Sequence, residues 1–148
     1  MGKSLFRFAD ALELAVVYAF CFFLNLLFNY VKVWDFNSYI LKAFFKNFMD
    51  YQTLIVFFFT FIVIVFHYQM LYRKKIEVYC RVLVGDTVLY IAIRYIRDCL
   101  MVLTVIYLLF LLIHVHLKFC LTGNIFLVFI FIIYILISAS QVRKYENF

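Results

Sequence analysis

Long, nearly uninterrupted runs of apolar residues dominate the pattern along the chain. Four runs reach or approach the roughly 20 apolar residues that a helix needs to cross a bilayer. They cover about 12–30, 54–71, 99–117 and 125–140, and the last is short but uniformly apolar. The pattern predicts an all-α, polytopic transmembrane protein with four spans in one membrane domain.

The first run could instead be a signal peptide, because two basic residues, Lys3 and Arg7, precede it. Signal peptides have such a basic segment before their apolar segment. However, Asp10, Glu13 and Asn25 interrupt the run, and no small-x-small cleavage site follows it. We therefore predict a membrane anchor that stays in the mature protein.

The segment 38–50, between the first two runs, has a helical period of its own. Ser38 is a capping residue, and the apolar residues after it recur on one face, with the charged residues elsewhere. Tyr30, Trp34, Tyr39 and Tyr51 lie in or beside the segment, as expected for aromatic residues at headgroup depth. The segment predicts an interfacial helix. The alternative is an ordinary loop in an aromatic-rich chain.

The segment 73–98, between the second and third runs, is too long and too charged for a simple turn. Its charges at Lys74, Glu77 and Arg81 recur at helical spacing, while Ile76, Tyr79 and Leu83 form another face. This pattern predicts an amphipathic helix in which Glu77 and Arg81 are within i,i+4 reach.

A helix stop and a helix start follow that amphipathic stretch. Gly85 can adopt the left-handed conformation that closes a helix, and Asp86 or Thr87 can cap the next one. A second arm, 88–98, carries Arg94 and Asp98 and runs into the third span. We expect a helix-turn-helix elbow that offers a charged surface to a soluble partner. The alternative is a salt-bridged interfacial hairpin without a partner.

Basic residues are distributed unevenly between the two sides of the expected bundle. Of 14 Lys and Arg residues, ten lie beside the two termini or in 73–98. The other four are Lys32, Lys42, Lys46 and Lys118. The positive-inside rule then places both termini and the elbow on the cytoplasmic or matrix side. The net charge of +6 is thus a topology signal, and we expect membrane lipid, not nucleic acid, as the chain's environment.

The composition supports a membrane protein and adds little chemistry. Hydrophobic residues make up 69% of the chain, far above the roughly half that is typical of soluble domains. The 21 Phe and 12 Tyr, with no Pro, indicate an AT-rich bacterial or organellar genome. The cysteines, Cys21, Cys80, Cys99 and Cys120, are scattered singly, so a disulfide framework or a zinc cluster is not expected.

Polar groups inside the spans are candidates for function or for packing. His67 lies near the inner end of the second span and His114 near the outer end of the third, too far apart to share an ion, while His114 and His116 point to different helix faces. We expect all three to be interfacial or helix-contact histidines. Asn25 is expected to form a hydrogen bond between helices. Because no catalytic constellation, metal-ligand cluster or phosphate loop is recognisable, we expect neither an enzyme nor a cofactor.

The elbow carries a basic stretch with an acid-hydrophobic pair, Arg73-Lys-Lys-Ile-Glu77-Val78. Arg81, a turn at Leu83-Val84-Gly85 and finally Asp98 before the third span follow it. In this order and spacing, about 54–144 resembles the membrane domain of FtsX-like, or MacB-type, ABC transporter permeases. The arginine is displaced by one position, and Gly-Asp-Thr replaces the family's Gly-Ala-Ser. The family's large extracytoplasmic domain is missing.

The resemblance implies that the elbow is a coupling helix that docks on an ATPase, and that the permease is a dimer. The residues expected at this coupling surface are Lys74, Lys75, Glu77, Arg81, Gly85, Asp86, Arg94 and Asp98. The chain has no Gly-x-x-x-x-Gly-Lys-Ser/Thr loop, so the ATPase would be a separate cytoplasmic chain at the bacterial cytoplasmic membrane.

A second hypothesis fits the same hydrophobicity: a small accessory subunit of a mitochondrial respiratory or ATP synthase complex, in the inner membrane. A third, an oligomeric pore or immunity-type protein, lacks a polar lining in the spans.

Overall fold

The computed structural model describes residues 7–35, 37–119 and 121–145, and within these ranges it contains helices and no strand. The helices are α1 (Phe8–Val33), α2 (Tyr39–Asp50), α3 (Gln52–Arg73), α4 (Lys75–Val84), α5 (Val88–Leu117) and α6 (Thr122–Ala139), followed by the 3-10 helix η1 (Ser140–Tyr145). Four of the helical segments, α1, α3, α5 and α6 with η1, are long and apolar enough to cross a membrane. The chain is therefore an integral membrane protein with four candidate spans, as the apolar runs predicted.

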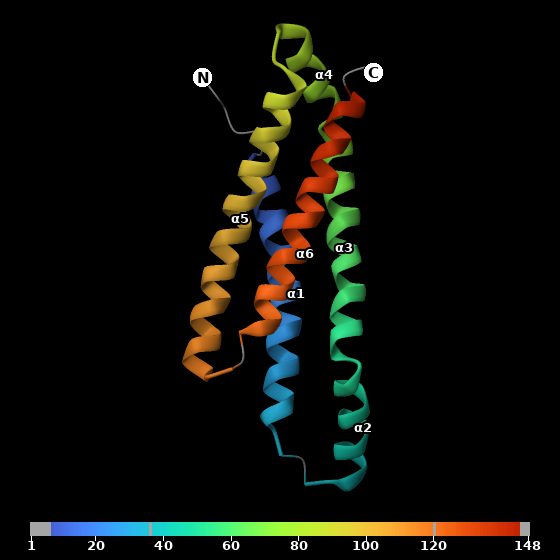
Figure 1. Ribbon diagram of the computed structural model, residues 1–148, viewed down its shortest axis with the longest axis vertical. Coiled ribbons are helices and arrows are strands. Elements are labelled where there is room, and N and C mark those ends of the chain that lie inside the picture. The colour runs from blue at the N-terminus through green and yellow to red at the C-terminus, as the bar shows by residue number, and fades with distance from the viewer. Residues whose placement is uncertain (1–6, 36, 120, 146–148) are drawn as a thin grey trace.

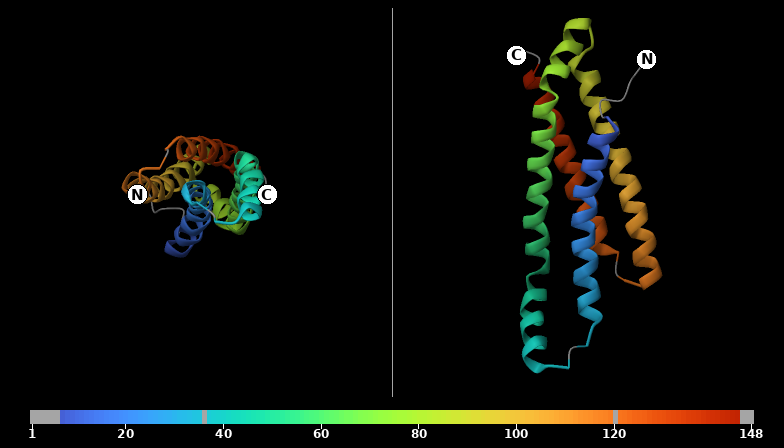
Figure 2. Two further views of the ribbon diagram at one scale, coloured as in Figure 1. Left: turned by 90° about the horizontal axis from the view of Figure 1, so that it is seen from below. Right: turned by 180° about the vertical axis from the view of Figure 1, so that it is seen from behind.

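The four long helices lie side by side in an elongated bundle (Figures 1 and 2). α1 packs against α3 and α5, and α6 packs against the same two helices. The start of α1, the elbow and η1 all lie at one end of the bundle, which we call the elbow end (Figure 1). α2 and the start of α6 lie toward the other end, the far end. Most of the basic residues are therefore gathered at the elbow end, as their distribution in the sequence predicted.

The helix predicted over 38–50 forms as α2, but it continues the direction of α3 and does not fold across the end of the bundle (Figures 1 and 2). Only Tyr51 separates the two helices. Ser38 is the N-cap residue, although its side chain makes no capping hydrogen bond. None of the α2 residues is buried, and contacts such as that of the Phe48 ring with Phe28, 5.7 Å between centroids, cover its apolar residues only in part.

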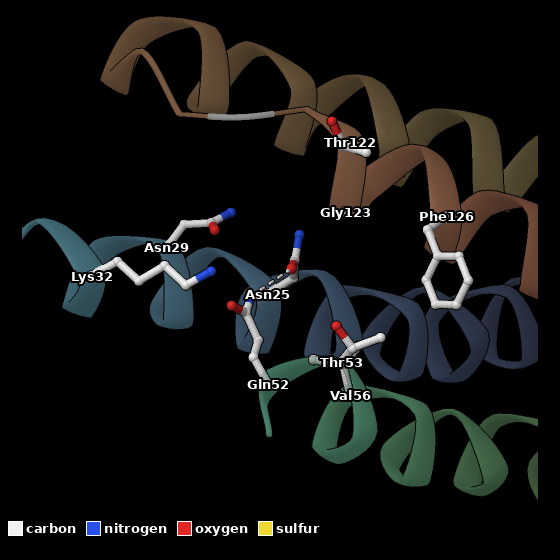
Figure 3. Close-up of a pocket in the computed structure, with 9 residues that line it drawn as sticks. All are labelled: Asn25, Asn29, Lys32, Gln52, Thr53, Val56, Thr122, Gly123 and Phe126. Carbon is white, nitrogen blue, oxygen red and sulfur yellow. Dashed lines mark hydrogen bonds between the residues drawn. The ribbon is translucent and has the colours of Figure 1, made fainter. Parts of the chain in front are cut away.

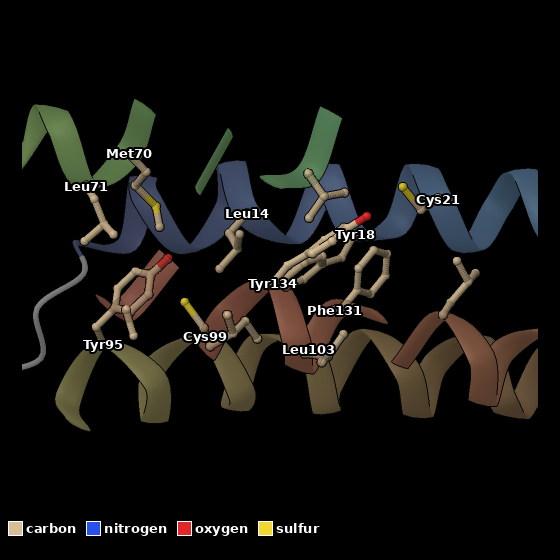
Figure 4. Packing of buried hydrophobic residues seen from close by; sticks show 14 of the residues in the cluster. Leu14, Tyr18, Cys21, Met70, Leu71, Tyr95, Cys99, Leu103, Phe131 and Tyr134 are labelled. Carbon is tan, nitrogen blue, oxygen red and sulfur yellow. The ribbon is translucent and has the colours of Figure 1, made fainter. Parts of the chain in front are cut away.

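Aromatic and aliphatic side chains from all four spans fill the centre of the bundle (Figure 4). The Phe131 ring lies 5.0 Å from the Tyr18 ring and 5.7 Å from the Phe22 ring, centroid to centroid, and these three side chains are fully buried. Many large apolar side chains also point outward along every span. Because lipid tails are as apolar as these residues, helix association here depends on close packing and on polar contacts between helices.

The elbow forms where the sequence predicted it. α4 ends at Gly85, whose φ of +111° lies in the left-handed region that favours glycine. The Asp86 N–H donates to the Arg81 carbonyl at 3.0 Å, which closes the helix end. Thr87, one of the two predicted caps, accepts a hydrogen bond from the Tyr90 N–H through its hydroxyl at 3.3 Å. From there α5 runs unbroken into the third span, which confirms the predicted second arm.

Candidate functional site

Ion pairs at the base of the elbow tie it to the first span. The ammonium of Lys74, at the junction of α3 and α4, lies 2.8 Å from the Asp10 carboxylate in the first turns of α1. It also lies 3.5 Å from Glu77, which pairs with Arg81 at 2.9 Å as the spacing predicted. The Lys74 side chain is only 9% exposed, so its charge is committed to partners within the chain.

A second pair connects the same two helices nearer the solvent. The Arg73 guanidinium donates to the Glu13 carboxylate at 2.7 Å, and both side chains are about half exposed. Such a pair contributes at most about 1 kcal/mol. The less exposed Lys74–Asp10 contact is therefore the stronger fastening between α1 and the elbow.

The first turns of α5 carry the other charged residues of the elbow. The Arg94 guanidinium lies over the Tyr90 ring, 4.1 Å from its centroid, and 3.9 Å from the Asp86 carboxylate at the turn. Asp98 pairs with Arg97 at 3.0 Å. Arg94 and Asp98 are both nearly buried. Arg94 therefore braces the turn against the helix that follows it.

The 3-10 helix η1 fills the space inside the elbow. It contacts α3, α4, α5 and α6, and its Val142 and Tyr145 side chains are buried. The Gln141 side-chain amide donates to the Tyr145 hydroxyl at 2.6 Å. The C-terminal segment thus supports the elbow from below and links it to the fourth span.

Three large apolar side chains are exposed around the turn of the elbow. Leu83 is 68% exposed, Val84 90% and Leu89 72%, and we call these three residues the elbow tip. The sequence placed Leu83 on the apolar face of α4, but did not show that this face turns away from the bundle.

The eight residues predicted at the coupling surface are therefore divided. Lys74, Arg94 and Asp98 are buried in contacts within the chain, and Gly85 shapes the turn. The remaining four, which are partly exposed, are Lys75, Glu77, Arg81 and Asp86. Sequence reasoning noted Asp10 only as an interruption of the first apolar run and missed it as the partner of Lys74. Comparison of the chain with protein-family models, curated proteins and solved structures gave no match.

A buried chain of hydrogen bonds joins all four spans below the elbow. The His67 ring on α3 bonds the Tyr18 hydroxyl on α1 through Nε2 and the Tyr95 hydroxyl on α5 through Nδ1, both at 2.7 Å. Tyr95 in turn bonds the Ser138 hydroxyl on α6 at 3.0 Å. We call these four residues the polar chain. It confirms His67 as a helix-contact histidine.

The hydrogen bond of Ser138 to a backbone carbonyl determines which group donates in each bond of the polar chain. Ser138 must donate its proton to the Ile135 carbonyl at 3.0 Å, because a carbonyl only accepts. Tyr95 therefore donates to Ser138 and accepts from His67 Nδ1–H, which leaves Nε2 of a neutral imidazole to accept from Tyr18. Every side-chain polar atom of the polar chain therefore has a hydrogen-bond partner when His67 is uncharged, which is the form that a buried site favours.

The other histidines lie elsewhere. His114 is also buried, but its Nδ1 bonds the Phe110 carbonyl of its own helix at 2.8 Å. It lies 19 residues beyond Tyr95 on α5, roughly 28 Å along the helix at the standard rise. His116 is exposed. His67 and His114 thus lie near opposite ends of the bundle, as their positions in the spans predicted.

A cavity of about 360 Å³ opens at the far end, between α1, α3 and the start of α6 (Figure 3). At its inner wall, the Asn25 amide donates to Asn124 Oδ1 at 2.7 Å and accepts from Gln52 at 3.5 Å. The predicted helix-to-helix hydrogen bond of Asn25 is therefore present. Sequence reasoning did not foresee the cavity, because its lining comes from three separate helices.

Proposed function

We propose that the chain is the membrane subunit of an ABC-type transporter or export system, and that its elbow couples a separate ATPase to the spans. The observation that carries this proposal is the construction of the elbow: a braced base with an exposed apolar tip. A membrane helix that runs into a basic stretch, a turn and the next membrane helix is also the arrangement in the permeases that about 54–144 resembles.

The position of the tip favours a protein partner over lipid. The charged residues Asp10, Glu13, Arg73 and Lys74 lie where α1 begins and α3 ends, and such residues favour headgroup depth over hydrocarbon. The elbow extends past this charged layer and past η1 (Figure 1). Leu83, Val84 and Leu89 therefore lie on the side of the charges away from the hydrocarbon. Exposed apolar side chains in such a place are characteristic of a docking surface.

The contacts of the elbow provide a route for motion from the tip to every span. α4 follows directly on α3, and the Lys74–Asp10 pair links it to α1. The other side of the turn is the start of α5 itself, and η1 joins the elbow to α6. A displacement of the tip would therefore move all four helices together instead of bending a loose loop.

By the positive-inside rule, the elbow faces the inner side of the membrane. In a transporter of this type, that side is the cytoplasm of a bacterium. The ATPase docks there as a separate chain, and two copies of this subunit form the transport unit. ATP hydrolysis belongs to the partner; this chain contributes the membrane path and the coupling.

The experiment is co-purification from the native membrane in a mild detergent, followed by mass spectrometry of the bound proteins. Val84→Asp places a charge on the most exposed residue of the tip, and we expect at least a tenfold loss of a bound subunit that carries a phosphate-binding Walker loop. Ile40→Asp is the matched control, because Ile40 is 79% exposed at the far end. A Walker-loop subunit that binds both variants equally well would refute docking through the tip.

A second candidate is an accessory subunit of a mitochondrial respiratory or ATP synthase complex. The polar chain favours it, since its hydrogen-bonding groups are all satisfied by partners within the protein. The same purification separates the two functions. Recovery of a set of respiratory or ATP synthase subunits, identified by their whole sequences and not by a Walker loop alone, would support this second candidate.

A further inference from the structure

The far-end cavity exists because the four spans end at different heights. α6 begins before the ends of α1 and α3 are reached, so these two helices continue past it (Figures 1 and 2). The space beside the first turn of α6 is therefore not filled by a fourth helix. Gly123 lines this space, and its lack of a side chain allows Asn25 to approach, since a Cβ there would lie 2.9 Å from the Asn25 amide atoms.

Hydrogen-bonding groups from three helices converge on the cavity. Its polar lining consists of three amides, two hydroxyls and one ammonium: Asn25, Asn29, Gln52, Thr53, Thr122 and Lys32. Figure 3 shows the Lys32 side chain extending along the cavity toward Asn25. Among the lining residues Lys32 carries the only charge, and no carboxylate is among them. The cavity thus combines an apolar wall, which includes Val56 and Phe126, with several hydrogen-bonding groups and one positive charge.

Two features at the start of α6 strengthen this character. The first residues of the helix, Thr122 and Gly123, line the cavity, and a helix N-terminus carries partial positive charge. The next residue, Asn124, is fully buried, and its Nδ2 has no hydrogen-bond partner in the described part of the chain, while its Oδ1 is taken by Asn25. Asn124 lies behind the lining, and its bond to Asn25 holds that amide in the cavity wall.

The depth of the cavity fits a headgroup phosphate. Thr122 and Arg143 are 21 residues apart in one continuous helical segment, about 30 Å at the helical rise, which is the thickness of a hydrocarbon core. With Arg143 at the inner boundary, Thr122 lies at the outer one. On α1, Lys32 lies 19 residues beyond Glu13, about 28 Å at the helical rise, so its ammonium lies near the outer boundary, next to the layer in which lipid phosphates lie.

We propose that this cavity binds the phosphate group of a small ligand or of a phospholipid headgroup. Lys32 supplies the charge, and the amides and hydroxyls supply donors to the several oxygens of a phosphate, more than the two oxygens of a carboxylate would use. The volume of about 360 Å³ lies within the usual range for ligand sites. This proposal rests on the far end alone and does not depend on the function proposed for the elbow.

The test is titration calorimetry on the delipidated protein in dodecyl maltoside, a detergent without phosphate. The probes are inorganic phosphate, dihexanoyl phosphatidylglycerol below its micelle concentration, and dihexanoylglycerol, which has the same chains but no phosphate. We expect saturable binding of at least one phosphate probe and none of dihexanoylglycerol. Binding of inorganic phosphate assigns a free phosphate ligand, whereas binding of phosphatidylglycerol alone assigns a lipid.

Two variants then locate the site. Lys32→Gln should weaken phosphate binding at least tenfold, because a charge-assisted hydrogen bond is lost. Lys46→Gln, on α2 at the same end of the bundle, removes the same charge outside the cavity and should leave affinity within twofold. Both residues are exposed, so neither variant should disturb the fold. Equal loss in both variants, equal binding of dihexanoylglycerol, or no binding of either phosphate probe would overturn the proposal.

Discussion

Replacing His67 with leucine tests whether the polar chain holds the four spans together. The substitution keeps a similar volume but removes both hydrogen bonds of the imidazole. Hydrogen bonds between membrane helices contribute about 0.6 kcal/mol each on average. The buried Tyr18 hydroxyl, which has no other hydrogen bond in the described part of the chain, would add about 1–3 kcal/mol. We therefore expect His67→Leu to lower the free energy of unfolding by about 2–4 kcal/mol.

The decisive variant removes all the hydrogen bonds of the polar chain that involve His67, Tyr18 and Tyr95. In His67→Leu with Tyr18→Phe and Tyr95→Phe, the one hydroxyl of the polar chain that remains is not left unpaired, because Ser138 still donates to the Ile135 carbonyl. Replacing all partners with apolar groups of similar shape is close to neutral. The triple variant should therefore recover at least half of the stability that His67→Leu loses.

The assay is reversible unfolding in mixed micelles, with helicity followed as the fraction of denaturing detergent rises. Tyr107→Phe is the control: this tyrosine lies on the same helix as Tyr95, and no hydrogen bond of its hydroxyl is present in the described structure. It should change stability by less than about 0.5 kcal/mol. If the triple variant were destabilised by the sum of its three single substitutions, the polar chain would not act as a unit and the reasoning would be wrong.

Three further substitutions follow from the same structure and the same unfolding assay. Lys74→Met should cost about 2–3 kcal/mol because it leaves the mostly buried Asp10 carboxylate without its cation, and Asp10→Asn added to it should restore part of the loss. Gly85→Ala should cost about 1–2 kcal/mol from backbone strain alone, because a Cβ there meets no atom within 4 Å. Gly123→Ala should cost about 1–3 kcal/mol through displacement of Asn25, and full stability in this variant would contradict the close approach of α1 and α6.

Local properties of the sequence determined the elements and where they end. Span length follows from hydropathy, so four helices were predictable within a few residues. The elbow was predictable because Gly85 and Thr87 act on their own neighbourhoods, and Glu77 and Arg81 meet within one helix. The partner type of Asn25 was predictable as well, since a buried amide in a lipid-facing helix needs a hydrogen-bond partner.

Tertiary structure decided which residues meet across helices. In a soluble helix the contrast between apolar and polar faces shows which side is buried, but in these spans both the lipid-facing and the core-facing sides are apolar. The sequence therefore could not show that Tyr18, His67 and Tyr95 share one level, or that Lys74 turns inward to Asp10. Both contacts depend on how neighbouring helices are rotated and shifted relative to one another. Close packing between the helices determines this arrangement, and no local sequence pattern indicates it.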